Sequence, residues 1–193
     1  VRFNEMKEAS PRTIELRDYQ PPHFFIDTVD LEFDLHEQGT RVIGRLGVRR
    51  NPEAGSGALR LDGEGLQPVW VRLDGRELSA DRYRVDAESL TLLDPPAAFV
   101  LETEVIIAPE DNTALEGLYR SGGMFCTQCE PEGFRKITWF VDRPDVMACF
   151  TVRIEADKAR YPVLLSNGNP RDSGDLPDDR HYAVWDDPIP KPS

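Results

Sequence analysis

The sequence predicts an all-β fold of packed antiparallel sheets with little helix. Apolar and polar residues alternate with a period of two in many short segments between residues 30 and 185, which is typical of strands that bury one face. No window of useful length shows the 3.6-residue period of an amphipathic helix. Sixteen prolines among 193 residues also favour short strands over long helices. Two or more sheets packed as in a β-sandwich fit these observations.

The first two expected strands form a hairpin with one face in water. Residues 30–36 alternate, the turn EQGT follows, and residues 41–49 alternate again with arginines on the outer face. Asp74-Gly75 predicts a tight hairpin after a strand at 69–73. Pro144 suits the first position of a short helical turn over residues 144–148. The remaining strands are expected at residues 58–61, 83–85, 89–93, 98–107, 148–156, 163–165 and 181–185.

The length suits one structural unit. With 193 residues the chain can form one full core, or two small sheets packed as one, and neither an internal repeat nor a linker divides it. Residues 1–22 are polar, contain prolines and lack a clear period, so we expect an extended arm. Residues 186–193, DDPIPKPS, have the proline-rich composition of a connector to a further domain.

The charge and composition argue against several partner classes. The net charge is −12, from 35 acidic and 23 basic residues, whereas a nucleic-acid binder needs clustered cations to displace counterions from phosphates. No stretch approaches the ~20 apolar residues of a membrane span, and the N-terminal residues contain no apolar signal core. Three cysteines, an odd number, fit a reducing compartment. We therefore expect a cytoplasmic protein that binds neither nucleic acid nor membrane.

Residues 112–145 are the candidate functional segment. They combine a glycine pair, a CxxC, acidic side chains, arginines and aromatic residues between two alternating segments. A strand needs none of this chemistry, and a simple turn would be shorter. Loops of this composition on a rigid sheet commonly carry binding residues, so we expect a functional loop region at one edge of the structure.

The CxxC formed by Cys126 and Cys129 has two functional interpretations. One is half of a zinc site, but a structural zinc needs four Cys or His ligands, and only Cys149 and three dispersed histidines remain. The other is a redox pair, which needs a thiol of lowered pKa and a strand-to-helix turn in a βαβ setting. The all-β pattern favours ordinary, partly buried thiols, and we expect no metal site in this chain.

Gln128 and Glu130 form a candidate binding pair. In extended backbone, a spacing of two residues points both side chains to the same face. A carboxylate beside an amide can bind an ammonium group, because the carboxylate supplies charge and the amide supplies orientation. The structural alternatives are a solvated pair at a rim, or a salt bridge between Glu130 and Arg135 or Arg143.

A long run within the segment resembles a known family. NTALEGLYRSGGMFCTQCEPEGFRKITWFVDRPDV, together with YQPPHFFIDTVDLEFDL, KARYPVLLSNGN and WDDPIPKP, resembles the N-terminal domain of the bacterial aminopeptidase N family of HExxH zinc metallopeptidases. The resemblance extends from about Asp18 to the last residue. One departure is Ser193, where the resemblance leads us to expect a cysteine.

The resemblance implies a multi-domain enzyme in which a saddle-shaped β domain precedes a thermolysin-like catalytic domain. The zinc, its ligands and the general base would belong to that second domain. The sequence contains no HExxH, so we expect residues 1–193 to be inactive alone and to hold no zinc. The domain's partners would be its own catalytic domain and peptide substrates with a free N-terminal amine. The alternative is a non-catalytic β-sandwich binding or interaction module that shares only the fold.

The resemblance also implies roles for the binding pair. Glu130 matches the glutamate that binds the free α-amino group of the peptide, and Gln128 matches the residue that lines the pocket for the first side chain. Such a domain would help the enzyme to remove single N-terminal residues. The rest of the segment is then expected to be scaffold: Gly122-Gly123 as a tight bend, Arg135, Asp142, Arg143 and Asp145 in ion pairs, and Phe134, Trp139 and Phe140 packed on the sheet.

Overall fold

The computed structural model describes residues 15–55 and 57–193 and confirms the all-β fold. In this part of the chain, the helical structure is limited to two single-turn 3-10 helices, η1 (Leu16–Asp18) and η2 (Phe134–Lys136). Residues 1–14 of the expected N-terminal arm lie outside the described residues, and the described remainder of the arm includes η1. Within the described ranges, no helix has the length and apolar character needed to cross a membrane.

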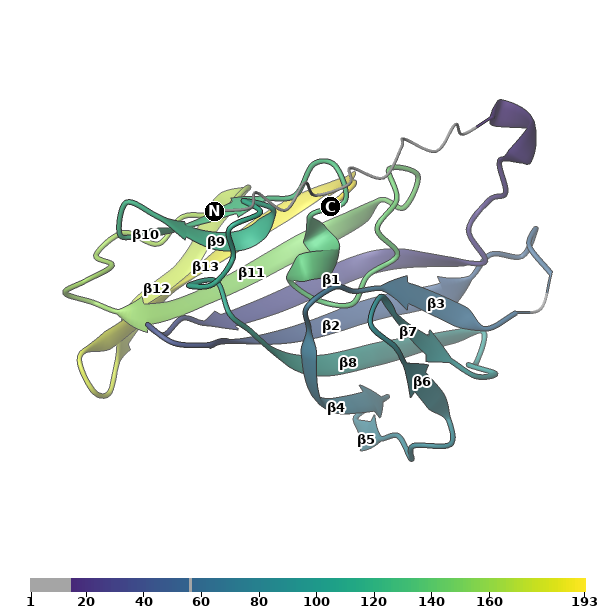
Figure 1. The fold of residues 1–193 in the computed structure, drawn as a ribbon, viewed down its shortest axis with the longest axis horizontal. Helices are drawn as coiled ribbons and strands as arrows, with labels where there is room; N and C mark the ends of the chain where they lie inside the picture. Colours follow the sequence, from purple (N-terminus) through teal and green to yellow (C-terminus); the bar gives the residue numbers. More distant parts are fainter. Residues whose placement is uncertain (1–14, 56) are drawn as a thin grey trace, which may run out of the picture.

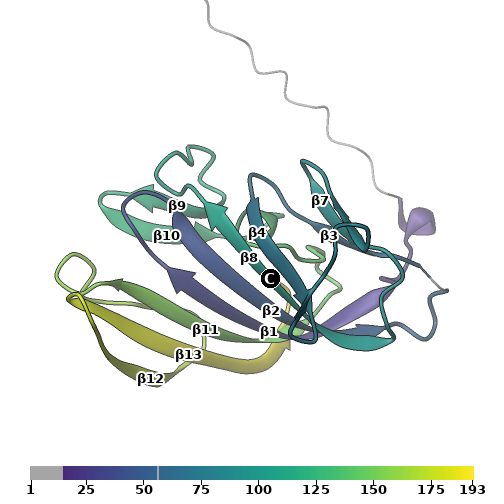
Figure 2. The same ribbon diagram turned by 90° about the horizontal axis from the view of Figure 1, so that it is seen from below.

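Eight strands form one large sheet. Figure 1 shows them side by side, and Figure 2 shows that the sheet curves along its length, in keeping with the saddle shape that the resemblance implies. In spatial order the strands are β12 (Asn169–Leu176), β13 (Arg180–Lys191), β11 (Ala148–Asp157), β1 (Phe24–Asp34), β2 (Thr40–Arg50), β8 (Ala98–Ile107), β4 (Gln67–Leu73) and β5 (Arg76–Glu77).

One strand pair is parallel, which differs from the expectation of antiparallel sheets. β1 pairs with β11 in parallel from Thr28↔Cys149 to Asp34↔Glu155, while the other pairings of the described strands are antiparallel. Parallel neighbours need a long connection, and residues 35–147 supply one. Alternation in the sequence reveals that each segment is a strand, but it carries no information about the direction of so distant a partner.

The two faces of the large sheet differ in polarity, as the alternation predicts. Phe33 of β1 is buried and aligns with the buried Val42 of β2. The opposite face carries cross-strand ion pairs such as Arg45–Glu102, in which Nη2 and Oε1 are 2.9 Å apart. The sheet therefore has one apolar face for packing and one charged face toward solvent.

Two smaller sheets cover the apolar face of the large sheet. One consists of β3 (Leu59–Asp62), β7 (Ser89–Leu92) and β6 (Tyr83–Val85), and the other is the hairpin of β9 (Gly117–Ser121) and β10 (Met124–Gln128). Figure 2 shows both on the same side of the large sheet. Leu61, Leu90 and Leu118 from the small sheets belong to the same buried cluster as Val42 and Leu46 of the large sheet. One hydrophobic core thus holds the three sheets together.

The prediction of a strand at residues 163–165 is wrong. These residues form no strand, and the edge strand of the large sheet is β12 instead. Leu164 is buried, whereas Val163 and Leu165 are exposed. The sequence of β12, NPRDSGDL, shows no apolar alternation because its side chains remain largely exposed at the sheet edge. The pattern of residues therefore could not reveal this strand.

The prediction of a helical turn at residues 144–148 is also wrong. Pro144 and Asp145 form a turn without a helix, and the helical turn near them is η2. The backbone N–H of Ile137 closes η2 by donating to Phe134 O at 2.9 Å. Phe134 is buried, so tertiary packing stabilises this single turn, which is too short to show a helical period.

Residues 186–191 of the expected connector belong to strand β13. β13 pairs with β12 only as far as Asp186, and beyond that residue it pairs with β11 on one side. Pro188 and Pro190 lack a backbone N–H and lie in this edge portion, where a sheet tolerates a missing donor. The role of residues 186–193 as a connector to a further domain stays a prediction.

Candidate functional site

The predicted loop region contains an ordered β-hairpin. β9 and β10 pair along their full length, and Gly122-Gly123 turns the chain between them. Both glycines have positive φ angles, 57° and 83°, the combination that a tight two-residue hairpin turn with the right twist requires. The expected tight bend is confirmed, but it lies within a hairpin rather than a long loop.

Glu130 lies in a tight turn directly after β10. The backbone N–H of Gly133 donates to Cys129 O at 2.7 Å and closes this turn, in which the Glu130–Pro131 peptide bond is cis. Gln128 Nε2 donates to Glu130 O, also at 2.7 Å. Because β10 ends at Gln128, Glu130 lies in the turn rather than in the strand. A side-chain hydrogen bond brings the two residues together instead.

The carboxylate of Glu130 is available to a ligand. Glu130 is exposed, and its carboxylate has no hydrogen bond or ion pair with any residue in the described ranges. The salt bridges considered from the sequence are absent in this part of the chain, because Arg135 pairs with Asp142 and Arg143 pairs with Asp145. A solvated position at a rim remains the structural alternative to ligand binding.

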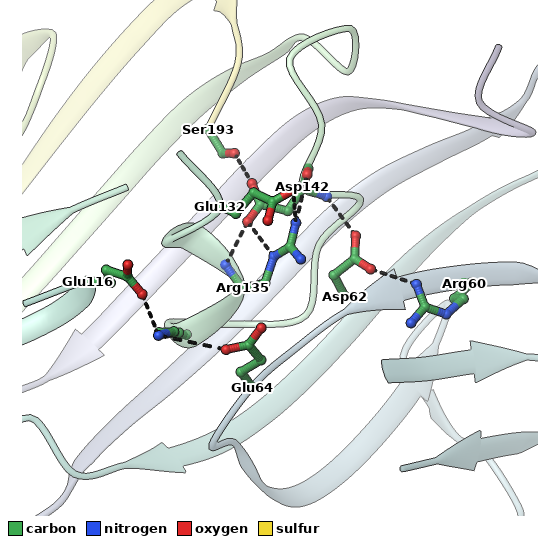
Figure 3. A network of polar contacts seen from close by, with 9 residues as sticks. Arg60, Asp62, Glu64, Glu116, Glu132, Arg135, Asp142 and Ser193 are labelled. Carbon is green, nitrogen blue, oxygen red and sulfur yellow. Dashed lines mark hydrogen bonds and ion pairs between the residues drawn. The ribbon is translucent and has the colours of Figure 1, made fainter. Parts of the chain in front are cut away.

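A buried ion pair anchors the chain that follows the turn (Figure 3). Asp142 Oδ2 accepts hydrogen bonds from Arg135 N at 3.1 Å and Arg135 Nε at 3.0 Å, and Arg135 Nη2 donates to Asp142 O at 3.1 Å. The Asp142 side chain is only 5% exposed. Burial works to lower the pKa of Arg135, but the hydrogen bond to Asp142 and the charges of Asp62, Asp142 and Glu132 raise this pKa above its ordinary value. Arg135 is therefore held in its charged form.

The other side chains expected to support the segment do so. Arg143 and Asp145 form a two-point ion pair, with Nη2 and Oδ2 2.6 Å apart and Nε and Oδ1 2.9 Å apart. Phe134, Trp139 and Phe140 are buried, and the rings of Phe134 and Phe140 meet edge-on with centroids 4.9 Å apart. Ion pairs and aromatic packing thus hold the segment on the body of the molecule, as predicted.

An apolar groove with a volume of about 690 Å³ adjoins the hairpin. Phe33 of β1, Val152 and Ile154 of β11, several residues of β10 and the segment 160–167 line it. Gln128 and Glu130 are not among its lining residues. The alternation in β1 and β11 was visible in the sequence, but residues 160–167 join the groove only in the folded chain.

The three cysteines are free thiols. Burial, and then the negative charges of Asp142 and Glu130, raise the pKa of Cys129 to about 11. A redox-active thiol needs a lowered pKa, so this environment argues against Cys129 as the reactive thiol of a redox pair. Among the residues that the structure describes, no group of three His, Cys, Asp or Glu side chains is placed to hold a metal ion.

Comparison with known sequences relates this chain to a peptidase family. Residues 82–193 match the family model described as the Peptidase M1 N-terminal domain. Aminopeptidase N of Caulobacter vibrioides is 55% identical over 188 residues, which cover 97% of this chain and 22% of that protein. Aminopeptidase N of Escherichia coli is 44% identical over 182 residues, which cover 94% of this chain and 21% of that protein.

Solved structures agree with this relationship. Aminopeptidase A of Legionella pneumophila, in complex with aspartic acid, has a TM-score of 0.88 at 34% identity over 93% of this chain and 21% of its own. A mutant M1 zinc metallopeptidase of Deinococcus radiodurans, bound to a Tyr-Ser-Ala substrate, shares the fold with a TM-score of 0.74 at 18% identity over 88% of this chain and 40% of its own. The chain spans about one fifth of the length of the curated relatives it matches. It belongs to the M1 peptidase family and corresponds to the N-terminal domain of that family.

Proposed function

We propose that this chain is the N-terminal domain of a zinc-dependent aminopeptidase that removes single residues from the N-termini of peptides. The placement of Glu130 carries the proposal. Its carboxylate is exposed and lacks a hydrogen-bonding partner in the described part of the chain, and it lies on a turn held by hydrogen bonds and followed by a buried ion pair. The names of the relatives, aminopeptidase N and aminopeptidase A, support the reaction class.

Glu130 would bind the positively charged α-amino group of a peptide. A hydrogen bond between a carboxylate and an ammonium group is charge-assisted and stronger than a neutral one. A carboxylate at a fixed position also sets the distance between the amine and the bond to be cut. An enzyme that holds the amine in this way cleaves after the first residue. Gln128, joined to the same turn, would line the pocket for the first side chain.

The described residues do not fit a zinc site. Within residues 15–55 and 57–193 no three suitable ligand side chains converge, and the sequence contains no HExxH. We therefore assign the zinc of the proposed enzyme to a separate catalytic domain, which is consistent with the one-fifth share of the relatives that this chain spans. We place the enzyme in the cytoplasm, where three free thiols stay reduced.

The test measures hydrolysis of aminoacyl p-nitroanilides by the full-length protein. We expect Glu130→Ala to lower kcat/KM by the equivalent of about 2–4 kcal/mol, as when one partner of a charge pair desolvated by binding is removed. Glu77→Ala is the matched control, because Glu77 is an exposed carboxylate on the edge strand β5 of the large sheet. We expect it to leave kcat/KM nearly unchanged. An unchanged kcat/KM in Glu130→Ala contradicts the assigned role.

The alternative, a non-catalytic β-sandwich module, makes different predictions. It predicts that Gln128 and Glu130 are replaceable and that the full-length protein holds no stoichiometric zinc. Our proposal predicts zinc-dependent turnover by the full-length protein and none by the 193-residue chain. Metal analysis and peptide hydrolysis, with the full-length protein and with the 193-residue chain, distinguish the two hypotheses. Zinc-dependent turnover by the 193-residue chain alone contradicts our assignment of the zinc to another domain.

A further inference from the structure

Asp142 connects distant parts of the chain through its two carboxylate oxygens (Figure 3). Oδ2 accepts hydrogen bonds from Arg135 N and Nε, at 3.1 and 3.0 Å, whereas Oδ1 accepts one from Ser193 Oγ at 2.9 Å. The backbone N–H of Asp142 donates to Asp62 Oδ2 at 3.3 Å. One buried side chain thereby joins η2 to residue 193, and its backbone joins both to β3 of the small sheet.

Arg135 is closely coupled to the turn that carries Glu130. η2 follows directly after Gly133, whose backbone closes the turn on Cys129. A Cβ atom at Gly133 would lie 2.3 Å from Gln128 O, so the two backbone segments of the turn are in close contact. Packed groups of this kind transmit displacements because they leave no free volume to absorb them. A shift of Arg135 would therefore move Glu130.

The other contacts of this region hold the turn less firmly against the body of the molecule. The hydrogen bond from Gln128 to Glu130 lies within the turn and its preceding strand. Lys136 pairs with Glu116 at 2.5 Å and with Glu64 at 3.7 Å, but both carboxylates are about half exposed, and exposed ion pairs contribute little. The backbone N–H of Glu64 also donates to Arg135 O at 3.0 Å. The buried carboxylate of Asp142 is therefore the main side-chain polar anchor of η2.

We propose that Asp142 is a positioning residue that holds the Glu130 turn in register with the chain at Ser193. This inference rests on the proposed function, in which Glu130 binds the substrate amine and the reacting groups lie in a separate domain. The distance between the amine anchor and the reacting groups then decides whether the substrate is held productively. A misplacement of about 1 Å can lower a rate by about a hundredfold. In this role Asp142 does not contact the substrate, and it acts through its hydrogen bonds with Arg135 and Ser193.

The test measures amine recognition by binding rather than by turnover. Isothermal titration calorimetry on the full-length enzyme gives the dissociation constants of L-leucine hydroxamate and of isocaproyl hydroxamate, which lacks only the amino group. The ratio of the two constants reports amine recognition, because the ligands share their other groups. We expect Asp142→Ala to reduce this ratio by on the order of tenfold and Glu130→Ala to bring it close to one.

Three further variants make the test specific. In Asp142→Asn the amide oxygen can still accept from Arg135 and the amide nitrogen can donate to Ser193 Oγ, so we expect most of the ratio to remain. Ser193→Ala removes only one contact of Asp142 and should lower the ratio several-fold, even if Asp142→Ala does not fold. Glu104→Gln is the matched control, since Glu104 is also buried and pairs with Arg41 on the charged face of the large sheet. We expect this control to keep the ratio.

A double-mutant cycle distinguishes the two proposals. Adding Asp142→Ala to Glu130→Ala should leave the ratio unchanged, because Asp142 acts through Glu130. A further change in the double variant overturns the positioning role. An unchanged ratio in both Asp142→Ala and Ser193→Ala also overturns it, and the proposed function survives if Glu130→Ala still lowers the ratio. An unchanged ratio in Glu130→Ala overturns the proposed function itself.

Discussion

The side-chain amide of Gln128 donates a 2.7 Å hydrogen bond to the backbone carbonyl oxygen of Glu130. This bond ties the last residue of β10 to the residue whose carboxylate is exposed. Gln128 uses one hydrogen of Nε2 for the contact, so its Oε1 and its second amide hydrogen remain for a ligand. Gln128 is therefore placed to affect both the shape of the turn and the recognition of the first side chain.

Gln128→Ala tests this dual role. We expect the relative kcat/KM values for substrates with different first residues to change more in this variant than in Glu130→Ala, since Glu130 would contact the amine that all substrates share. The lost hydrogen bond should also lower the free energy of unfolding by about 1 kcal/mol. Hydrolysis of a panel of aminoacyl p-nitroanilides and urea unfolding measure the two effects. A uniform loss across the panel contradicts a role in side-chain recognition.

Glu130→Gln is expected to lower the pKa of Cys129 from its value of about 11. A nearby negative charge disfavours the thiolate and raises a thiol pKa, so neutralising that charge lowers the pKa. Burial is the largest cause of the shift and remains in the variant, so the pKa should stay above the ordinary 9.0. The pH dependence of iodoacetamide labelling, followed by mass spectrometry of the Cys129 peptide, measures this. Fast labelling of Cys129 at neutral pH would contradict the prediction.

Gly133→Ala is expected to disrupt the Glu130 turn by steric overlap alone. The φ angle of Gly133 is −86°, which suits alanine, but the added Cβ would lie 2.3 Å from Gln128 O and 3.0 Å from Gly117 N. Relief of this overlap requires backbone shifts, which typically cost about 1–3 kcal/mol of stability. Urea unfolding measures the loss. Gly55→Ala is the matched control, because a Cβ there meets nothing within 4 Å; equal stability of the two variants contradicts the prediction.

Asp145→Asn is expected to destabilise the fold in a pH-dependent manner. Burial works to raise the pKa of Asp145, but hydrogen bonds from Arg143 and Tyr19 lower this pKa overall. A carboxyl group with a lower pKa in the folded state stabilises that state above its unfolded pKa of about 3.9, and the stabilisation is lost as the pH falls through the folded pKa. We expect a loss of about 1 kcal/mol at neutral pH.

Urea unfolding across a pH series measures this linkage. The difference between the parent protein and Asp145→Asn should shrink as the pH falls below about 4. A difference that stays constant into acid would show that the charge of Asp145 does not contribute to stability.

Much of the fold could be predicted because alternation is a local property of a strand. The face expected for residues 98–107 is buried at Phe99, Leu101, Thr103 and Val105, and Leu31 on β1 is buried as expected. Where side chains are exposed on both faces, as in β12, the same signal disappears. The single turn of η2 is likewise too short to show a helical period, and packing of Phe134 stabilises it.

The candidate site was likewise predictable from the sequence only in part. Gln128 and Glu130 were identified as candidates from the sequence. Ion pairs among Arg135, Asp142, Arg143 and Asp145 were also expected. The sequence left open whether one of these arginines would neutralise Glu130. The structure decides this question, because Asp142 and Asp145 occupy the two guanidinium groups.

The sequence by itself determined the all-β class, most strand positions and the residues that support the turn. These features depend on the polarity of side chains a few residues apart, which can be read from the sequence itself. Only the tertiary structure decided the parallel pairing of β1 with β11, the bend that ends β10 at Gln128, and the contact of Asp142 with Ser193. Such features depend on which distant segments pack against each other. Burial and hydrogen bonding across the whole chain determine which segments become partners.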